Sequence, residues 1–294
     1  MPVIVMTGAT SGIGAVAASR LARPDTRLIV GARGGALPGA GTLPLDLASL
    51  ASVRAFADAV VAALAGARID ALLLNAGGQR PDVEIRSADG FELTFATNHL
   101  AHYLLLRLLT PHLAPDARIV ITSSGTHDPA ENTGVPAPRH ADARRLAHPE
   151  TDPRRDAKPT AAGMRAYAAS KLANLMTARH LAASPEARAW TVIAYDPGLT
   201  PGTGLVREQH WAIRRLVWPV LPLVTRFGKG MNSLADAGRG LADLATVAVP
   251  PPGRVYAALR KGVLTWPDPS TLARDDAATA KLWDDSAALV GLTG

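Results

Sequence analysis

The apolar positions of the first 200 residues follow two alternating spacings. Apolar residues recur at helical spacing over 13–22, 50–64 and about 91–113. Short runs rich in Val, Ile and Leu, bounded by turn residues, are typical of buried parallel strands, and they cover 3–6, 27–30, 69–74 and 118–122. Strands that alternate with helices predict right-handed crossovers and a Rossmann-type, doubly wound parallel sheet with helices on both faces.

The second half of the chain continues this alternation after one interruption. Residues 126–163 contain six prolines and little apolar periodicity, so we expect a long surface insertion with one helical turn near 142–147. Loops of this length are usually functional or disordered. We expect a single α/β domain over 1–294, whose remaining elements are a helix at about 165–183, a strand at 190–195 and a final strand near 255–257.

Composition narrows the class of protein. With 48% apolar and 19% charged residues, the chain is not disordered as a whole. The absence of cysteine excludes disulfides, a thiolate nucleophile and cysteine zinc sites. The formal net charge is +6, but no basic run exceeds two residues, so we expect no nucleic-acid partner. Residues 167–230 hold eight basic and three acidic residues. This positive surplus indicates that the segment lies at the rim of a site that attracts an anion.

The membrane signals in the sequence are weak. The longest apolar stretch, 216–224, has nine residues with two prolines and is too short to cross a bilayer. No charged region precedes the apolar start of the chain, as it would in a signal peptide. We therefore expect a cytoplasmic protein without stable membrane insertion. An interfacial helix over 206–230 is the alternative.

A glycine-rich loop joins the first expected strand to the first expected helix. Gly8 would permit a tight turn, Gly12 would let the backbone approach a pyrophosphate, and Gly14 would let the helix pack on the strand. The position directly behind a buried N-terminal strand favours a dinucleotide site. Three residues, where the common fingerprint has one, separate Gly8 from Gly12 in the loop Thr7-Gly8-Ala9-Thr10-Ser11-Gly12-Ile13-Gly14.

Seven motifs, this loop included, follow one another over roughly residues 3–200. The chain resembles the short-chain dehydrogenase/reductase family in its TGxxxGxG loop and its YxxxK pair. The other matches are Asp46-Leu47, Asn75-Ala76-Gly77 (with Leu74 in place of the family's first Asn), Asn98, Ser123-Ser124 and Asp196-Pro197-Gly198. The resemblance implies an oxidoreductase that binds a nicotinamide cofactor through Thr7, Gly8, Thr10, Ser11, Gly12, Ile13, Gly14, Asp46, Leu47, Asn75, Ala76, Gly77, Tyr167, Lys171, Pro197 and Gly198.

The same resemblance implies that Asn98, Ser124, Tyr167 and Lys171 form the catalytic set. Residues four apart lie on one face of a helix, and a nearby ammonium would lower the pKa of the Tyr167 phenol from about 10. Tyr167 would then act as general acid in reduction or general base in oxidation. Ser124, or alternatively Ser123, would bind the substrate oxygen. By resemblance, Lys171 also binds the nicotinamide ribose, and Asn98 holds a water that relays protons.

The end of the second strand bears on the choice of cofactor. NAD-preferring enzymes of this type usually have an acidic residue there, which binds the ribose 2′-OH, whereas this chain has Arg33. Because a guanidinium can pair with a 2′-phosphate, we expect NADP(H) to be preferred over NAD(H). The family's next helix is truncated or missing between Arg33 and Asp46. On the nicotinamide side, Thr200 and Thr203 are both candidates for contact with the carboxamide.

The substrate and the partners are less constrained. The insertion and a substrate loop at 199–230 resemble retinol-dehydrogenase-like and protochlorophyllide-reductase-like members and, more narrowly, the anthracycline side-chain ketoreductases of actinomycete polyketide pathways. We expect NADP(H)-dependent interconversion of a ketone or aldehyde and its alcohol, on a bulky apolar substrate, with a homodimer possible. The alternatives are reduction of a carbon–carbon double bond and a non-catalytic NADPH sensor. His99 and His102 are interpreted as helix-packing residues, and no metal is expected.

Overall fold

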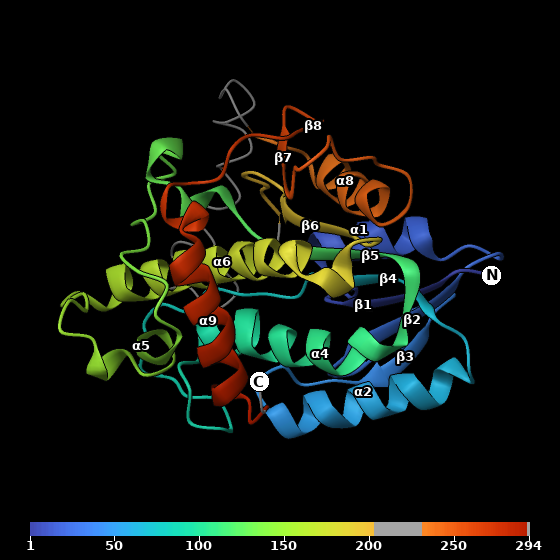
Figure 1. Cartoon of the computed structure of the whole chain (residues 1–294), viewed down its shortest axis with the longest axis horizontal. Coiled ribbons are helices and arrows are strands. Elements are labelled where there is room, and N and C mark those ends of the chain that lie inside the picture. Colours follow the sequence, from blue (N-terminus) through green and yellow to red (C-terminus); the bar gives the residue numbers. More distant parts are fainter. Residues whose placement is uncertain (203–230, 293–294) are drawn as a thin grey trace.

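The centre of the molecule is an eight-stranded sheet with the strand order β3-β2-β1-β4-β5-β6-β7-β8 (Figure 1). This computed structural model describes residues 1–202 and 231–292. Strands β1 to β7 are parallel, and β8 is antiparallel to β7. The strands are β1 Val3–Thr7, β2 Arg27–Ala32, β3 Gly41–Pro44, β4 Ile69–Leu74, β5 Leu113–Thr122, β6 Thr191–Asp196, β7 Tyr256–Arg260 and β8 Val263–Thr265.

Helices cover both faces of this sheet, which confirms the predicted doubly wound fold. Helices α1 (Gly12–Leu21) and α8 (Leu234–Thr246) lie on one face. The other face carries α2 (Leu50–Leu64), α4 (Ala101–Leu109) and α6 (Pro159–Ala183), and α9 (Asp276–Leu289) packs outside α4 and α6 (Figure 1). None of the helices in the described part of the chain is long and apolar enough to span a membrane.

Alternate residues of the buried strands supply two separate cores. In β1, Val3 and Val5 pack with α2, α4 and α6, whereas Ile4 and Met6 pack with α1 and α8. Successive side chains of a strand point to opposite faces, so an apolar run with no polar alternation is the pattern of a strand buried on both sides. This is why the strands of the first half were recognisable from sequence.

The prediction of one continuous helix over about 91–113 is wrong in detail. The segment begins with the short helix α3 (Leu93–Phe95), widens into a π-turn at Ala96–Leu100, continues as α4 and ends in a 3₁₀ turn at Thr110–His112. The Glu92 carboxylate caps the first turn by accepting hydrogen bonds from the amides of Thr94 (2.8 Å) and Phe95 (2.6 Å). At the other end Pro111 has no N–H to donate, which ends the regular helix.

Other expectations need smaller corrections. The helix expected from about 165 begins at Pro159, a residue well suited to the first helical turn. The interval between Arg33 and Asp46 contains strand β3 and no helix, which confirms the expected loss of a helix there. Strands β3 and β8 and helices α8 and α9 were not anticipated. The final strand, expected near 255–257, is β7, and β8 follows it.

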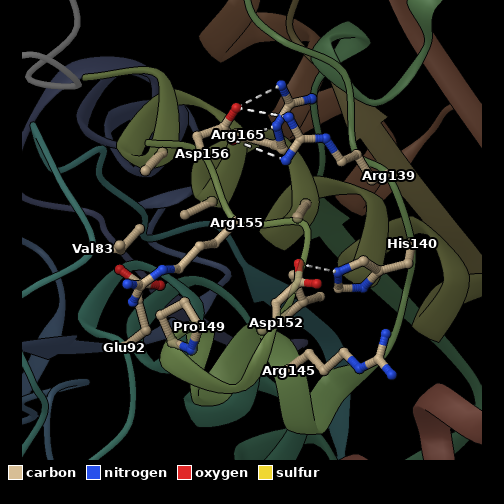
Figure 2. Close-up of a pocket in the computed structure, with 14 residues that line it drawn as sticks. Val83, Glu92, Arg139, His140, Arg145, Pro149, Asp152, Arg155, Asp156 and Arg165 are labelled. Carbon is tan, nitrogen blue, oxygen red and sulfur yellow. Dashed lines mark hydrogen bonds and ion pairs between the residues drawn. The ribbon is translucent and has the colours of Figure 1, made fainter. Parts of the chain in front are cut away.

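Side-chain contacts of two aspartates hold the 126–163 insertion together, and one of them attaches it to α6 through Arg165. The Asp156 carboxylate accepts hydrogen bonds from Arg165 Nε (2.6 Å) and Arg139 Nη2 (2.8 Å), and His140 Nε2 lies 3.0 Å from Asp152 Oδ2 (Figure 2). The helical turn expected near 142–147 is present as α5 (Ala143–Ala147). A pocket of about 60 Å³ lies beneath these pairs, and none of its lining residues belongs to the expected catalytic set.

Candidate active site

The predicted site residues gather at the carboxyl edge of the sheet, where parallel strands end together. Thr7 ends β1, Asn75 follows β4, and Ser124 follows β5. The Asn75 side chain joins three of these ends, because its Nδ2 donates to Gly8 O (3.2 Å) and its Oδ1 accepts from Thr122 Oγ1 (3.1 Å). Ligands of doubly wound sheets bind outside this edge.

The β1–α1 loop has the geometry of a phosphate cradle. Gly8 and Gly12 adopt positive φ angles of 70° and 58°, a region that L-residues with a Cβ rarely enter. A Cβ at Gly14 would overlap the Gly8 carbonyl oxygen and lie 2.6 Å from Asn75 Nδ2. Ser11 makes no side-chain cap, and the first turn of α1 contains no acidic residue. The first amides of α1 are therefore available to an anion such as a pyrophosphate.

Two further predicted cofactor residues lie farther along the same edge. Gly31 of β2 pairs with Thr7 of β1, and Arg33 lies two residues past Gly31, just after the end of β2, with its side chain exposed. Asp46 is also exposed and stabilises the turn before α2 by accepting a hydrogen bond from the Ala48 amide (3.0 Å). Leu47 packs against the core. Of these side chains, the Arg33 guanidinium is the one suited to a phosphate.

The two adjacent serines have different surroundings. Ser123 is 1% exposed, and its hydroxyl donates to the backbone carbonyl of Lys171 (2.8 Å). A side-chain interaction with Ser124 lowers the pKa of the Tyr167 phenol, and the Ser124 hydroxyl accepts from the Thr126 amide (3.4 Å). The ring of His127 also holds Ser124, because its Nδ1 lies 2.8 Å from the Ser124 carbonyl oxygen. Ser124 is therefore the serine whose side chain interacts with the candidate acid, and its binding of the substrate oxygen stays a prediction.

Helix α6 carries Tyr167 and Lys171 on the face turned towards the strand ends. Both are almost fully buried, and the Lys171 ammonium lies 5.8 Å from the centroid of the Tyr167 ring. Lys171 Nζ donates to the Thr122 carbonyl (3.1 Å), which also accepts from Asn174 Nδ2 (3.0 Å). The end of β5 thus fixes the position of the lysine relative to Ser124.

The pKa of Tyr167 differs from the sequence-based expectation. Burial raises the pKa of its phenol to about 12, and the nearby Asp196 carboxylate adds to the rise, although the side-chain interaction with Ser124 opposes it. Burial lowers the pKa of Lys171 to about 8. The direction differs from the expected lowering by Lys171, because burial is the largest influence on the pKa of Tyr167 and Lys171 is not among its causes. At neutral pH Tyr167 is a protonated hydrogen-bond donor.

Asn98 lies in the π-turn at Ala96–Leu100 and joins two parts of the site. Its Nδ2 donates to Gly78 O (2.9 Å) and to Ser170 Oγ (3.0 Å), and its Oδ1 accepts from the Gly78 amide (2.9 Å). The loop after β4 is thereby attached to α6, one residue before Lys171. The proton-relaying water that the resemblance places at Asn98 stays a prediction.

The segment Asp196-Pro197-Gly198 is held by residues that the sequence did not suggest. Asp196, 1% exposed, accepts hydrogen bonds from Arg260 Nη1 (2.8 Å) and Tyr256 Oη (3.2 Å) through Oδ2 and from the Gly198 amide (2.9 Å) through Oδ1. Asn232 Nδ2 donates to Pro197 O (2.9 Å). Because Asn232, Tyr256 and Arg260 lie 35 to 64 positions from the groups that they contact, no local pattern could have identified them.

Thr200 and Thr203 had both been candidates on the nicotinamide side. Thr200 is 5% exposed, and its hydroxyl lies 3.2 Å from both Pro197 O and Gly198 O. Thr203 lies outside the described residues, as does most of the 199–230 segment. Thr200 is therefore attached to the backbone of the segment beside which the cofactor ring is expected.

The two histidines of the long helical segment are packed inside the protein. Each is 1% exposed, and burial lowers the pKa of His99 to about 3 and that of His102 to about 4. His99 contacts Asn174 and Ser286, and His102 contacts Thr7 and Asn98. Within 1–202 and 231–292, no three His, Asp or Glu side chains are grouped to hold a metal ion.

Comparison with known proteins identifies the family of this chain. Residues 2–135 match the family model for short chain dehydrogenase. The chain is 32% identical to dehydrogenase/reductase SDR family member 13 of Bos taurus over 98% of this chain and 73% of the relative. It is 34% identical to the chloroplastic protochlorophyllide reductase of Chlamydomonas reinhardtii over 98% of this chain and 78% of that protein.

Solved structures share the fold over most of the chain. An uncharacterized protein from Mycobacterium paratuberculosis superposes with a TM-score of 0.72 and 27% identity, covering 99% of this chain and 94% of its own. A 3-alpha-hydroxysteroid dehydrogenase from Pseudomonas sp. B-0831, solved with NADH, gives a TM-score of 0.58 and 23% identity, covering 83% and 90%. The second likeness bears on the fold alone.

The raised pKa of Tyr167 leads to a prediction for tyrosine ionisation. All four tyrosines have a pKa above the ordinary value of 10 because they are buried. Absorbance near 295 nm, followed from pH 7 to 10, should therefore show almost no tyrosinate in the native protein, whereas the urea-unfolded chain should titrate near pH 10. A native ionisation step below pH 9.5 that disappears in Tyr167→Phe would show instead that Lys171 governs the phenol.

Proposed function

The chain belongs to the short-chain dehydrogenase/reductase family of oxidoreductases, and from that premise we propose that it reduces a ketone or aldehyde to an alcohol with NADP(H), or runs the reverse reaction. The observation that carries this proposal is that Tyr167 and Lys171 lie one helical turn apart on α6, with the Lys171 ammonium 5.8 Å from the centroid of the Tyr167 ring and the Ser124 side chain interacting with the phenol. These side chains stand beside the cradle at Gly8 and Gly12 that is shaped for a dinucleotide.

The proposed roles follow from what each side chain can donate. When bound, a nicotinamide cofactor supplies the hydride that the reaction needs. Tyr167 and Ser124 hold the substrate oxygen between their hydroxyl groups, which stabilises the negative charge that develops there. Tyr167, protonated at neutral pH, then transfers its phenolic proton to that oxygen as general acid. Lys171 holds the cofactor ribose, and its contact with the Thr122 carbonyl fixes it in place.

The preference for NADP(H) is proposed from Arg33. Its exposed guanidinium follows β2, at the position where an acidic residue would receive the ribose 2′-OH of NAD. A guanidinium offers two parallel N–H donors to a phosphate and cannot accept a hydrogen bond from a ribose hydroxyl. Thr10, Ser11 and Ile13 of the β1–α1 loop complete the proposed phosphate contacts.

The substrate is proposed to be bulky and apolar, of polyketide type, held by a substrate loop at 199–230. A second candidate is reduction of a carbon–carbon double bond, which the 34% identity to a protochlorophyllide reductase favours. The two differ in product, because a carbonyl substrate gives an alcohol and an enone-type substrate gives a saturated ketone.

We propose one domain for the whole chain, with 126–163 as its insertion. A cytoplasmic location and a homodimer stay predictions.

Replacing the proposed acid tests the reaction. Tyr167→Phe should lower kcat for NADPH-dependent reduction of aromatic and polyketide-like ketones by about 10²–10⁴-fold, because general acid catalysis contributes that much. NADPH binding should persist. Tyr103→Phe is a matched control, since it also removes one buried phenol hydroxyl, whose partner is Arg107 (2.6 Å) on α4, and it should retain wild-type turnover. Wild-type turnover in Tyr167→Phe would contradict the proposed mechanism.

Reversing the charge at Arg33 tests the cofactor preference. Arg33→Asp should lower kcat/KM with NADPH relative to NADH by about 10–100-fold, because hydrogen bonds to charged groups contribute about 1.5–3 kcal/mol. The comparison is Arg23→Asp, which makes the same charge change at an exposed position beyond the C-terminus of α1, at the opposite edge of the sheet. An equal shift in both variants would indicate a general field effect and not a phosphate contact.

A further inference from the structure

We propose that His102 is a positioning residue that holds the end of β1 and the π-turn of Asn98 in register. This inference rests on the proposed function, because it assigns His102 a part in aligning the cofactor cradle with the proton-transfer site. His102 lies on α4, behind the site, and touches neither substrate nor cofactor directly.

The contacts of His102 run in two directions from one buried ring. Its Nε2 lies 2.9 Å from the Thr7 hydroxyl at the end of β1, 95 positions away in sequence. Its Nδ1 lies 3.1 Å from the backbone carbonyl oxygen of Asn98, within the π-turn. The ring is 1% exposed, so water cannot readily replace either contact.

The partners determine which ring nitrogen carries the proton. A carbonyl oxygen only accepts, so Nδ1 must donate to Asn98. The two acceptor positions of the Thr7 hydroxyl are taken by the amides of Asn75 (3.0 Å) and Ala76 (3.1 Å). Thr7 therefore donates its own proton, and His102 Nε2 must accept it. Each donor in this series has one acceptor, and the neutral imidazole is required.

The hydrogen bonds continue from both ends of the ring into the site. On one side, the Thr7 hydroxyl holds the amides that follow β4, beside the turn at Gly8. On the other side, Asn98 donates to Ser170 Oγ (3.0 Å), which donates in turn to the Tyr167 carbonyl (2.7 Å). His102 thus connects the cofactor cradle to the helix that carries the proposed acid.

His99 provides an internal comparison on the same helical segment. It is equally buried and also bridges two partners, with Nε2 2.9 Å from Ser286 Oγ on α9 and Nδ1 3.3 Å from Asn174 Oδ1. Its Nε2 partner is a hydroxyl of the C-terminal helix and not of the cofactor loop. Removing the Ser286 hydroxyl should therefore disturb packing without changing the cradle.

Two conservative variants separate the two contacts of His102. His102→Gln can keep an acceptor near Thr7 and should retain the wild-type Kd for NADPH, but lower kcat about 10-fold. His102→Asn can keep a donor near the Asn98 carbonyl and should retain kcat at saturating NADPH, while Kd for NADPH rises about 10-fold. NADPH binding is measured by fluorescence titration without a carbonyl substrate, together with the Tm of each variant. Ser286→Ala should lower Tm while changing neither Kd nor kcat.

Thr7 keeps the test decisive if the His102 variants do not fold. Thr7→Val removes the hydroxyl and should raise Kd for NADPH at least 10-fold, and Thr7→Ser should restore it. The proposal is overturned if the His102 variants change Kd and kcat together in proportion to Tm, or change neither. Failure of wild-type protein to bind NADPH would instead refute the proposed function, so the two failures are distinguishable.

Discussion

The side-chain amide of Asn75 is the contact on which the arrangement of the site depends. Its oxygen accepts a hydrogen bond from the Thr122 hydroxyl, and its nitrogen donates one to the Gly8 carbonyl. These two bonds join the ends of β5, β4 and β1. The Thr122 hydroxyl belongs to a buried residue (7% exposed), and leaving a buried polar group without a partner costs about 1–3 kcal/mol, which opposes separation of these strand ends. These strand ends lead directly into the glycine loop and Ser124, and the carbonyl of Thr122 at the end of β5 binds the Lys171 ammonium.

Much of this arrangement could be predicted because it depends on local sequence patterns. Strands buried on both faces give continuous apolar runs, and the position of the glycine loop between β1 and α1 follows from sequence order. The spacing of Tyr167 and Lys171 places both side chains on one helix face, and the structure brings Ser124 against the tyrosine. The electrostatics could not be predicted in this way, because the pKa of Tyr167 depends on its burial, and burial is set by the whole fold.

Helix α9, in the C-terminal third of the chain, was not predicted, for a different physical reason. Helix α9 buries Thr279, Asp285 and Ser286 alongside Leu282, so its inner face is not marked by an apolar stripe. What holds it are contacts with distant residues, such as the edge-on packing of Trp283 on Tyr103 at 4.9 Å. The hydrogen bond from Arg260 to Asp196 is likewise a contact between separate strands. The π-turn at Asn98 interrupts a sequence pattern that predicts one continuous helix.

In the proposed reaction, hydride reaches a carbonyl carbon while Tyr167 protonates the oxygen. Incubating the protein with NADPH stereospecifically deuterated at C4 and a panel of ketones, followed by mass and NMR analysis of the products, tests this directly. We predict deuterium from one face of the cofactor on the carbinol carbon, and loss of this product in Tyr167→Phe. Deuterium on the carbon β to an intact carbonyl, or a labelled alcohol formed equally well by the variant, would contradict the account.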